Sequence, residues 1–193
     1  MFYSVVKVIL AIIFRIIFRI KIEGSENIPL TGRLVVCSNH FSNWDPLVIA
    51  AFFKRKISWM GKKELFENKI LKHPLSWLGV FPVDRHETDI TAVKTALKIL
   101  KEERVLGIFP EGTRVKEYNP ENAKAGVALL ALRSKAPVIP IYIKSNYKLF
   151  KPLTIILGEV IDYNTQYPGK LDNEQYSQIS KDILQKIYKL GGK

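Results

Sequence analysis

A histidine and an aspartate lie five positions apart, directly after a short apolar run at residues 34–37. They are His40 and Asp45, separated by residues 41–44. Histidine is the usual general base near neutral pH, and a carboxylate on its other ring nitrogen fixes the tautomer and stabilises the imidazolium. A turn over the four intervening residues would bring the two side chains together. In the alternative interpretation Asp45 only caps a helix that starts at Pro46, and His40 only satisfies backbone groups.

Other polar groups also follow short apolar runs. They are Lys62, the pair Asp84 and Arg85, and the run Glu111, Gly112, Thr113 and Arg114. Because function gathers at the carboxyl ends of strands in open α/β sheets, we expect these groups to converge with His40. Arg114 has a planar fork suited to phosphate, and Gly112 lets backbone approach a ligand closely. Glu111 would orient an arginine or accept from a substrate hydroxyl. Alternatively, the arginines are solvated surface charges and Gly112 belongs to a plain turn.

Covalent catalysis and metal binding have little support in the sequence. There is no Gly-x-Ser-x-Gly elbow, and the one cysteine, Cys37, lies inside the apolar run, as a small buried hydrophobe does. His40, His73 and His86 share no ligand spacing, so we expect no bound metal. The proton that His40 removes would then come from a substrate hydroxyl, which favours direct transfer over a covalent enzyme intermediate.

Short apolar runs alternate with segments of helical periodicity, which predicts an α/β sheet. We expect His73–Pro74 to end one of the helices and Thr88 or Asp89 to cap the next. The predicted strands are 33–38, 57–60, 80–83, 105–109, 138–143 and 154–157, and the predicted helices are 47–54, 62–71, 89–101, 123–134 and 175–190.

Residues 1–22 are apolar but interrupted by cations. The longest uncharged stretch after Lys7 is only seven residues, too short for a spanning helix. On a helical projection Ser4, Lys7, Arg15 and Arg19 fall within an arc of roughly 120°. This pattern favours a helix that lies in the membrane interface, with its apolar face in the lipid and its cations near the headgroups. Packing on the protein's own body and spanning the bilayer are the alternatives.

The composition indicates one globular domain, residues 23–193, after this helix. The chain has 193 residues, 47% of them hydrophobic, which excludes a disordered chain. A net charge of +12 favours polyanionic partners: nucleic acid, an anionic membrane or acidic carriers. A single cysteine excludes an internal disulfide.

The ordered motifs resemble the glycerolipid acyltransferase family, most closely its 1-acylglycerol-3-phosphate O-acyltransferases. The likeness covers roughly residues 20–165. The motifs that carry it are "NHFSNWDP" at 39–46, "GKKELF" at 61–66, "FPVDR" at 81–85, "FPEGTR" at 109–114 and "VIPI" at 138–141. The resemblance implies a mixed, largely parallel sheet flanked by helices.

By this resemblance His40 is the general base and Asp45 its partner. Lys62 matches a basic position that helps to hold phosphate, and Pro140 shapes the pocket. The family positions associated with acceptor binding correspond to Arg85, Glu111, Gly112, Thr113 and Arg114.

The resemblance also implies the reaction and the partners. A fatty acyl group would pass from acyl-CoA or acyl carrier protein, as co-substrate and without a bound cofactor, to the free hydroxyl of lysophosphatidate, giving phosphatidate. Membrane phospholipids would be partners, nucleic acid would not, and the enzyme would sit on the cytoplasmic face of the cell membrane. The alternatives are glycerol-3-phosphate or another lysophospholipid as acceptor, and a non-catalytic basic protein that binds membrane or nucleic acid.

Overall fold

A sheet of seven strands forms the centre of the chain. In the computed structural model, which describes residues 2–84 and 89–192, the strand order is β1-β7-β6-β2-β5-β3-β4. Five neighbouring pairs are parallel, and β6 with β7 is antiparallel. The predicted α/β fold with a largely parallel sheet is therefore confirmed. The strands are β1 (Arg19–Glu23), β2 (Leu34–Ser38), β3 (Ile57–Lys62), β4 (Val80–Val83), β5 (Val105–Ile108), β6 (Val138–Lys144) and β7 (Pro152–Leu157).

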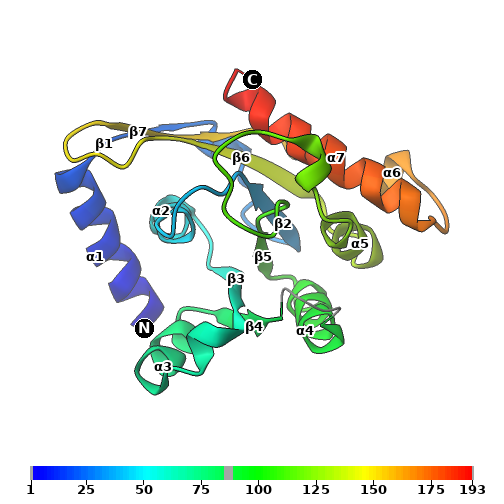
Figure 1. Ribbon diagram of the computed structural model, residues 1–193, viewed down its shortest axis with the longest axis horizontal. Helices are drawn as coiled ribbons and strands as arrows, with labels where there is room; N and C mark the ends of the chain where they lie inside the picture. The colour runs from blue at the N-terminus through cyan, green and yellow to red at the C-terminus, as the bar shows by residue number, and fades with distance from the viewer. Residues whose placement is uncertain (1, 85–88, 193) are drawn as a thin grey trace.

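Helices cover both faces of this sheet (Figure 1). α1 and α2 pack against one face, and α4, α5 and α7 pack against the other, while α3 lies beside β4 at the sheet edge. The helices are α1 (Phe2–Ile17), α2 (Asp45–Phe52), α3 (Lys69–Trp77), α4 (Ile90–Lys101), α5 (Gly126–Arg133), α6 (Tyr163–Gln166) and α7 (Asn173–Leu190), with short 3-10 turns η1 (Ser25–Asn27), η2 (Lys63–Phe66) and η3 (Pro120–Asn122).

The central strand β2 contributes side chains to both hydrophobic cores. Val35 and Cys37 pack with α4, α5 and α7, whereas Leu34 and Val36 pack with α1 and α2. This division follows from the alternation of side chains along a strand, and a strand covered on both faces is apolar throughout. β2 is fully buried along its length and carries His40 to the carboxyl edge of the sheet.

The amino-terminal helix is shorter than the predicted region 1–22. α1 ends at Ile17, and Arg19–Glu23 forms the edge strand β1 against β7. The sequence Arg-Ile-Lys-Ile-Glu alternates polar and apolar residues as a strand does, so sheet pairing replaces the helical continuation. No helix within residues 2–84 and 89–192 is both long enough and apolar enough to cross a membrane.

α1 turns an apolar side away from the body. Its exposed large hydrophobic side chains are Phe2, Val5, Val8, Ile9, Ile12, Ile13 and Ile16. Lys7, predicted to lie among the cations near the headgroups, points the other way, because its Nζ donates to the carbonyl of Phe53.

The predicted helix break at His73–Pro74 is wrong, because α3 continues through Pro74. A proline inside a helix removes one N–H donor, and here the carbonyl that loses this partner belongs to Ile70, whose side chain is 82% exposed. The helix therefore loses this hydrogen bond at an exposed residue. The predicted cap at Asp89 is confirmed, since its side chain accepts from the backbone N–H of Ala92.

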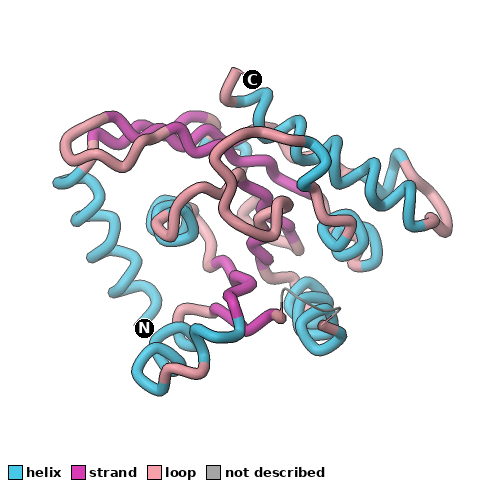
Figure 2. The backbone as a smooth tube through the Cα atoms, in the orientation of Figure 1, coloured by secondary structure: helices cyan, strands magenta, loops and turns pink. Residues whose placement is uncertain are grey.

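The loops that follow β2 and β5 meet at the carboxyl edge of the sheet (Figure 2). The N–H of Val115 donates to the carbonyl of His40 over 2.8 Å. The amide of Asn39 donates to the carbonyl of Ile143 and accepts from its N–H, at 3.1 and 2.8 Å. The side chain of Asn39 thus imitates one more pair of the β2–β6 ladder and holds the backbone of His40 in place.

Candidate active site

The structure brings His40 and Asp45 into contact. Nδ1 of His40 lies 2.9 Å from Oδ2 of Asp45, and both side chains are buried, with Asp45 at 0% exposure. Residues 41–44 make the turn that this contact requires, and α2 begins at Asp45. A carboxylate facing Nδ1 makes that nitrogen the donor and leaves Nε2 free to accept a proton.

Asp45 is held by four donors. Oδ2 also accepts from the backbone N–H groups of Phe41 and Ser42, at 2.8 and 2.7 Å, and Oδ1 accepts from the hydroxyl of Tyr147 at 2.7 Å. Together these donors fix both oxygens of the carboxylate in position. The alternative in which Asp45 only caps a helix is wrong: the residue before α2 is Trp44, and the carboxylate bonds to the preceding turn rather than to the first turn of α2.

Tyr147 is a member of this site that sequence reasoning missed. It lies in the loop between β6 and β7, 102 positions from Asp45, in the left-handed backbone region with φ of 51°. Burial and the neighbouring Asp45 carboxylate raise the pKa of Tyr147 above its ordinary value. The hydroxyl therefore stays protonated, as a donor, across neutral and moderately alkaline pH. A lone tyrosine in a polar loop gives no sequence signal for this role.

Glu111 holds the backbone of His40 through a hydrogen bond. Its Oε2 accepts from the N–H of His40 at 2.9 Å, and its Oε1 accepts from the hydroxyl of Tyr188 at 2.6 Å. The residue is 1% exposed, and burial raises the pKa of its carboxyl, opposed by those two hydrogen bonds. Glu111 was predicted to orient an arginine or to accept from a substrate hydroxyl. Both of its oxygens instead accept from groups of the chain itself, because the carboxylate is buried under α7.

A stack of three rings sets the plane of the imidazole. The ring of His40 lies on Phe109 with centroids 4.0 Å apart and 16° between planes, and Phe109 lies on Trp59 at 5.0 Å and 14°. Trp59 reaches this position because Gly107 has no side chain: a Cβ there would come within 2.4 Å of the indole. With the plane set by Phe109 and rotation stopped by Asp45, Nε2 has a fixed direction.

His40 forms part of the wall of a largely apolar cavity of about 260 Å³ between α1, α2, β3 and α3. Tyr3, Lys7 and Leu10 of α1 also contribute to its wall, and Lys62 lies at the end of β3. Burial lowers the pKa of Lys7 below its ordinary value. The remaining lining residues are Val6, Asn43, Pro46, Leu47, Ala50, Ala51, Trp59, Met60, Gly61, Leu65, Leu75, Leu78, Val80 and Phe109.

The other predicted site residues that the structure describes lie outside the contact between His40 and Asp45. Lys62 is exposed and pairs with Glu64 at 3.0 Å. Gly112 has a φ of 67°, which favours glycine, and borders a second cavity of about 430 Å³ beyond Phe109. Thr113 and Arg114 are exposed in the same loop. Arg85 lies outside the residues that the structure describes.

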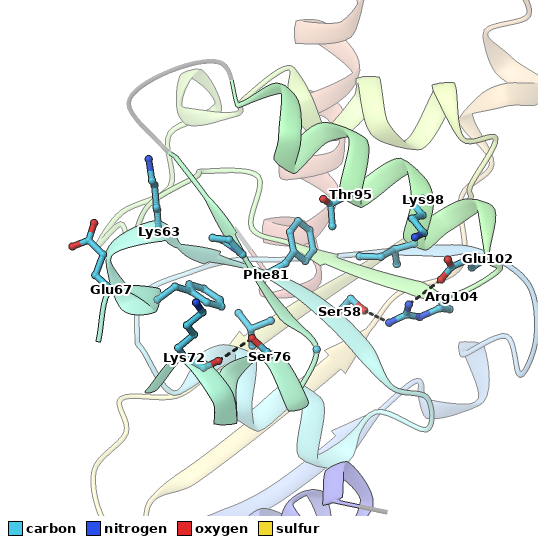
Figure 3. Close-up of a pocket in the computed structure, with 15 residues that line it drawn as sticks. Ser58, Lys63, Glu67, Lys72, Ser76, Phe81, Thr95, Lys98, Glu102 and Arg104 are labelled. Atoms are coloured by element: carbon cyan, nitrogen blue, oxygen red, sulfur yellow. Dashed lines mark hydrogen bonds and ion pairs between the residues drawn. The ribbon is translucent and has the colours of Figure 1, made fainter. Parts of the chain in front are cut away.

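A larger hollow lies elsewhere (Figure 3). An open groove of about 660 Å³ runs beside β4 between α3 and α4, and neither His40 nor Asp45 borders it. The described residues that line it include the cations Lys63, Lys72, Lys98 and Arg104 but no histidine, and Arg104 is bonded to Ser58 at 3.1 Å and to Glu102 at 3.0 Å. The arrangement that can do chemistry is therefore at the smaller cavity.

The described residues of the site include no metal-binding cluster and no exposed thiol. Within the described part of the chain no three His, Cys, Asp or Glu side chains gather in a way that would hold a metal ion. Cys37 is fully buried, and burial raises the pKa of its thiol. What the site offers is a base at Nε2, a fixed carboxylate behind it and an apolar cavity in front.

Comparison with known proteins places this site in a family. The sequence model of the family described as Acyltransferase matches residues 19–144, a span that contains His40, Asp45 and Glu111. The chain belongs to the Acyltransferase family, and the predicted enzyme class is confirmed.

The relatives are named more specifically. The chain is 32% identical over 181 residues to the 1-acyl-sn-glycerol-3-phosphate acyltransferase of Bacillus subtilis (strain 168), covering 90% of this chain and 89% of the relative. It is 28% identical over 171 residues to the protein of the same name from Borreliella burgdorferi, covering 88% of this chain and 68% of that one. The crystal structure of the 1-acyl-sn-glycerophosphate (LPA) acyltransferase PlsC from Thermotoga maritima matches with a TM-score of 0.62 and 21% identity, covering 88% of this chain and 72% of that one. That last similarity supports the fold.

Proposed function

We propose that the protein transfers a fatty acyl group from a thioester to the free hydroxyl of 1-acylglycerol-3-phosphate, giving phosphatidate for phospholipid synthesis. The observation that carries this proposal is the His40–Asp45 pair in the wall of an apolar cavity. The curated names of the relatives from Bacillus subtilis and Borreliella burgdorferi support the same acceptor.

His40 and Asp45 together move the proton of the acceptor hydroxyl. Nε2 of His40 takes the proton of the acceptor hydroxyl while that oxygen bonds to the thioester carbonyl carbon, and Asp45 stabilises the imidazolium. The carbon–sulfur bond then breaks, and the imidazolium returns the proton to the departing thiolate. No group of the chain becomes acylated, because the attacking oxygen belongs to the acceptor.

The apolar cavity suits the hydrocarbon chain of the donor. Burying a methylene group contributes about 0.8 kcal/mol, so a chain lying between α1 and α2 would hold the thioester carbon near His40. Acyl-CoA and acyl carrier protein both present such a chain, as co-substrates rather than as bound cofactors.

The phosphate of the acceptor would meet the cations around the cavity entrance. Lys62 borders the same cavity as His40, and Arg114 is exposed in the loop that also supplies Glu111. Arg85, Gly112 and Thr113 stay predicted members of this acceptor site. A planar guanidinium is suited to bidentate phosphate binding, which gives Arg114 a role distinct from that of Lys62.

The exposed apolar side of α1 would rest in the membrane interface. Val5, Ile9, Ile12 and Ile16 face outward, whereas the opposite side of the helix packs on the body and lines the cavity. A lipid acceptor could then enter the site from the bilayer. This arrangement corresponds to peripheral attachment, and the cytoplasmic face stays part of the proposal.

The test is turnover by the pure protein with lysophosphatidate, comparing acyl-CoA with acyl carrier protein as donor. We expect His40→Ala to lose at least a hundredfold in kcat/KM, while His73→Ala, which removes an exposed histidine on α3, keeps wild-type turnover. An active wild type whose His40→Ala variant turns over normally would refute the assignment. A preference for glycerol-3-phosphate or another lysophospholipid in an acceptor panel would replace the substrate but keep the chemistry.

A further inference from the structure

The loop between β6 and β7 presents two large apolar side chains to the outside. Leu149 and Phe150 are each 66% exposed, and exposed lysines, Lys148 and Lys151, flank them on both sides. Single exposed hydrophobic residues are common, but an adjacent leucine and phenylalanine at a loop tip, bracketed by cations, form a local amphipathic unit.

The backbone holds these side chains outward. Phe150 has a φ of 59°, in the left-handed region that a bulky residue rarely adopts. Its N–H donates to the carbonyl of Ile17 at 2.7 Å, and the N–H of Lys151 donates to the carbonyl of Lys148 at 3.2 Å. Phe150 therefore has a backbone conformation that glycine would adopt more easily. Because its ring is mostly exposed, burial of the ring within the protein contributes little stabilisation to offset this strain.

The tip continues the exposed side of α1. The hydrogen bond from Phe150 to Ile17 joins the loop to the last residue of that helix, next to Ile16, which is 67% exposed. Figure 1 shows the β6–β7 loop at the same corner of the molecule as the carboxyl end of α1. The two elements therefore present apolar side chains along one edge.

A hollow lined by lysines lies at the base of the same loop. It has a volume of about 560 Å³, and Lys21, Lys144 and Lys151 border it. The acid among its lining residues, Glu23, is paired with Lys21 at 2.8 Å. This hollow opens on the face of the sheet opposite α1, because Lys21 alternates with Ile20 and Ile22, which pack on the α1 side. The cations placed to meet an anionic lipid headgroup at the tip itself are therefore Lys148 and Lys151.

We infer that the tip of the β6–β7 loop is a second membrane contact: Leu149 and Phe150 insert among the lipids, and the flanking Lys148 and Lys151 bind anionic headgroups. The choice of a bilayer as the occupant rests on the proposed function, because the acceptor of that reaction is itself an anionic lipid. Together with α1 the tip gives two fixed contacts, which orient the protein on the surface rather than merely tether it.

The same loop also reaches the dyad. Tyr147, whose hydroxyl donates to Asp45, comes two residues before Leu149. Two residues of extended chain span at most about 7 Å. Insertion of the tip would therefore place Tyr147, which holds Asp45, next to the lipid surface.

Site-specific fluorescence tests insertion directly. The one native cysteine, Cys37, is fully buried, so Leu149→Cys can be labelled with an environment-sensitive dye in the purified full chain. With vesicles of equal parts phosphatidylcholine and phosphatidylglycerol we expect the emission at this position to rise and shift to the blue, and we expect the same response from a label at Ile12→Cys on α1. Leu30→Cys, 73% exposed at the opposite end of the sheet before β2, serves as the matched control and should not respond.

Binding measurements give the second readout. We expect the double variant Leu149→Ser, Phe150→Ser to partition about thirtyfold less onto these vesicles, and Leu30→Ser to partition as the wild type does. Lys148→Glu with Lys151→Glu should weaken binding to the anionic vesicles but not to vesicles of phosphatidylcholine alone. Turnover of lysophosphatidate in detergent micelles should stay within about twofold of wild type for all these variants.

Failure of this inference is distinguishable from failure of the proposed function. A silent label at position 149 in an active protein whose label at position 12 responds would overturn the tip contact alone. A label that responds to protein concentration without vesicles would show that the tip meets a second copy of the chain, which also overturns it. A protein that inserts normally but transfers no acyl group would overturn the proposed function and leave the tip contact standing.

Discussion

Asp45→Asn removes the charge behind His40, and the surrounding donors predict how the new side chain sits. Two backbone N–H groups, from Phe41 and Ser42, point at the position of Oδ2. An amide NH₂ at that position would face two donors, so the amide oxygen must occupy it. Nδ1 of His40 then still donates to an oxygen, and the hydroxyl of Tyr147 rotates to accept from the new NH₂ group. The tautomer of His40 is therefore preserved.

The expected loss follows from the charge alone. Unit charges about 4 Å apart interact by about 4 kcal/mol at an effective dielectric constant near 20. Because only part of the proton has moved to His40 in the transition state, we expect a loss of about 2 to 4 kcal/mol, which corresponds to about 30- to 1000-fold in kcat/KM. An inverted tautomer costs more, about ten-thousandfold in the serine-protease triad.

The assay is release of the donor thiol with lysophosphatidate as acceptor, together with ¹⁵N chemical shifts of the histidine ring. The shifts should show Nε2 without a proton in both wild type and the Asp45→Asn variant. A proton on Nε2 in the variant, or a loss far above a thousandfold, would refute the reasoning from Phe41 and Ser42. A loss below about threefold would show that the Asp45 charge contributes little.

Three further changes test other parts of the site. Tyr147→Phe leaves Oδ1 of Asp45 without its donor, so the free energy of unfolding should fall by about 1.5 to 3 kcal/mol in urea titrations; an unchanged midpoint would contradict the contact. Ala50→Phe fills part of the apolar cavity, so the ratio of rates with long and short acyl donors should fall about fourfold for each methylene excluded, and an unchanged ratio would remove the acyl chain from this cavity. Burial raises the pKa of Glu111 above its ordinary 4.5, so the folded chain binds this proton more tightly than the unfolded chain, and its contribution to stability falls as pH rises from about 4.5 through the folded value. The Glu111→Gln variant should lack this fall of stability with pH. If the free energy of unfolding depends on pH in the same way in the wild type and in the variant, the prediction is contradicted.

Most elements of the fold could be predicted because their apolar patterns are local. The run at Leu34–Ser38 and the helical spacing of Ile90–Lys101 both follow from periodicity alone. β1 was missed because its isoleucines continue the apolar stretch of α1, and only pairing with β7 makes Arg19–Glu23 extended. The break expected at Pro74 failed because local propensity gives way where the lost hydrogen bond lies at the surface.

Within the site, only the contact between residues close in sequence could be predicted. His40 and Asp45 lie five positions apart, so a turn suffices to join them, and the structure places them in contact. Tyr147 and Tyr188 could not be predicted, because the loop after β6 and the packing of α7 bring them in from far along the chain. The role of Glu111 was misjudged for the same reason: its burial depends on α7, which no spacing around residue 111 reveals.

The contact between Tyr188 and Glu111 makes completion of the site a late event in folding. Glu111 holds the backbone of His40, and its partner hydroxyl arrives 77 positions later, on the helix that packs over the sheet last in chain order. A nascent chain in which α7 has not yet docked carries the dyad residues but leaves one oxygen of a buried carboxylate without its donor. Catalytic activity in this protein should therefore report that the whole sheet is covered, and appearance of turnover during synthesis or refolding would time the docking of α7.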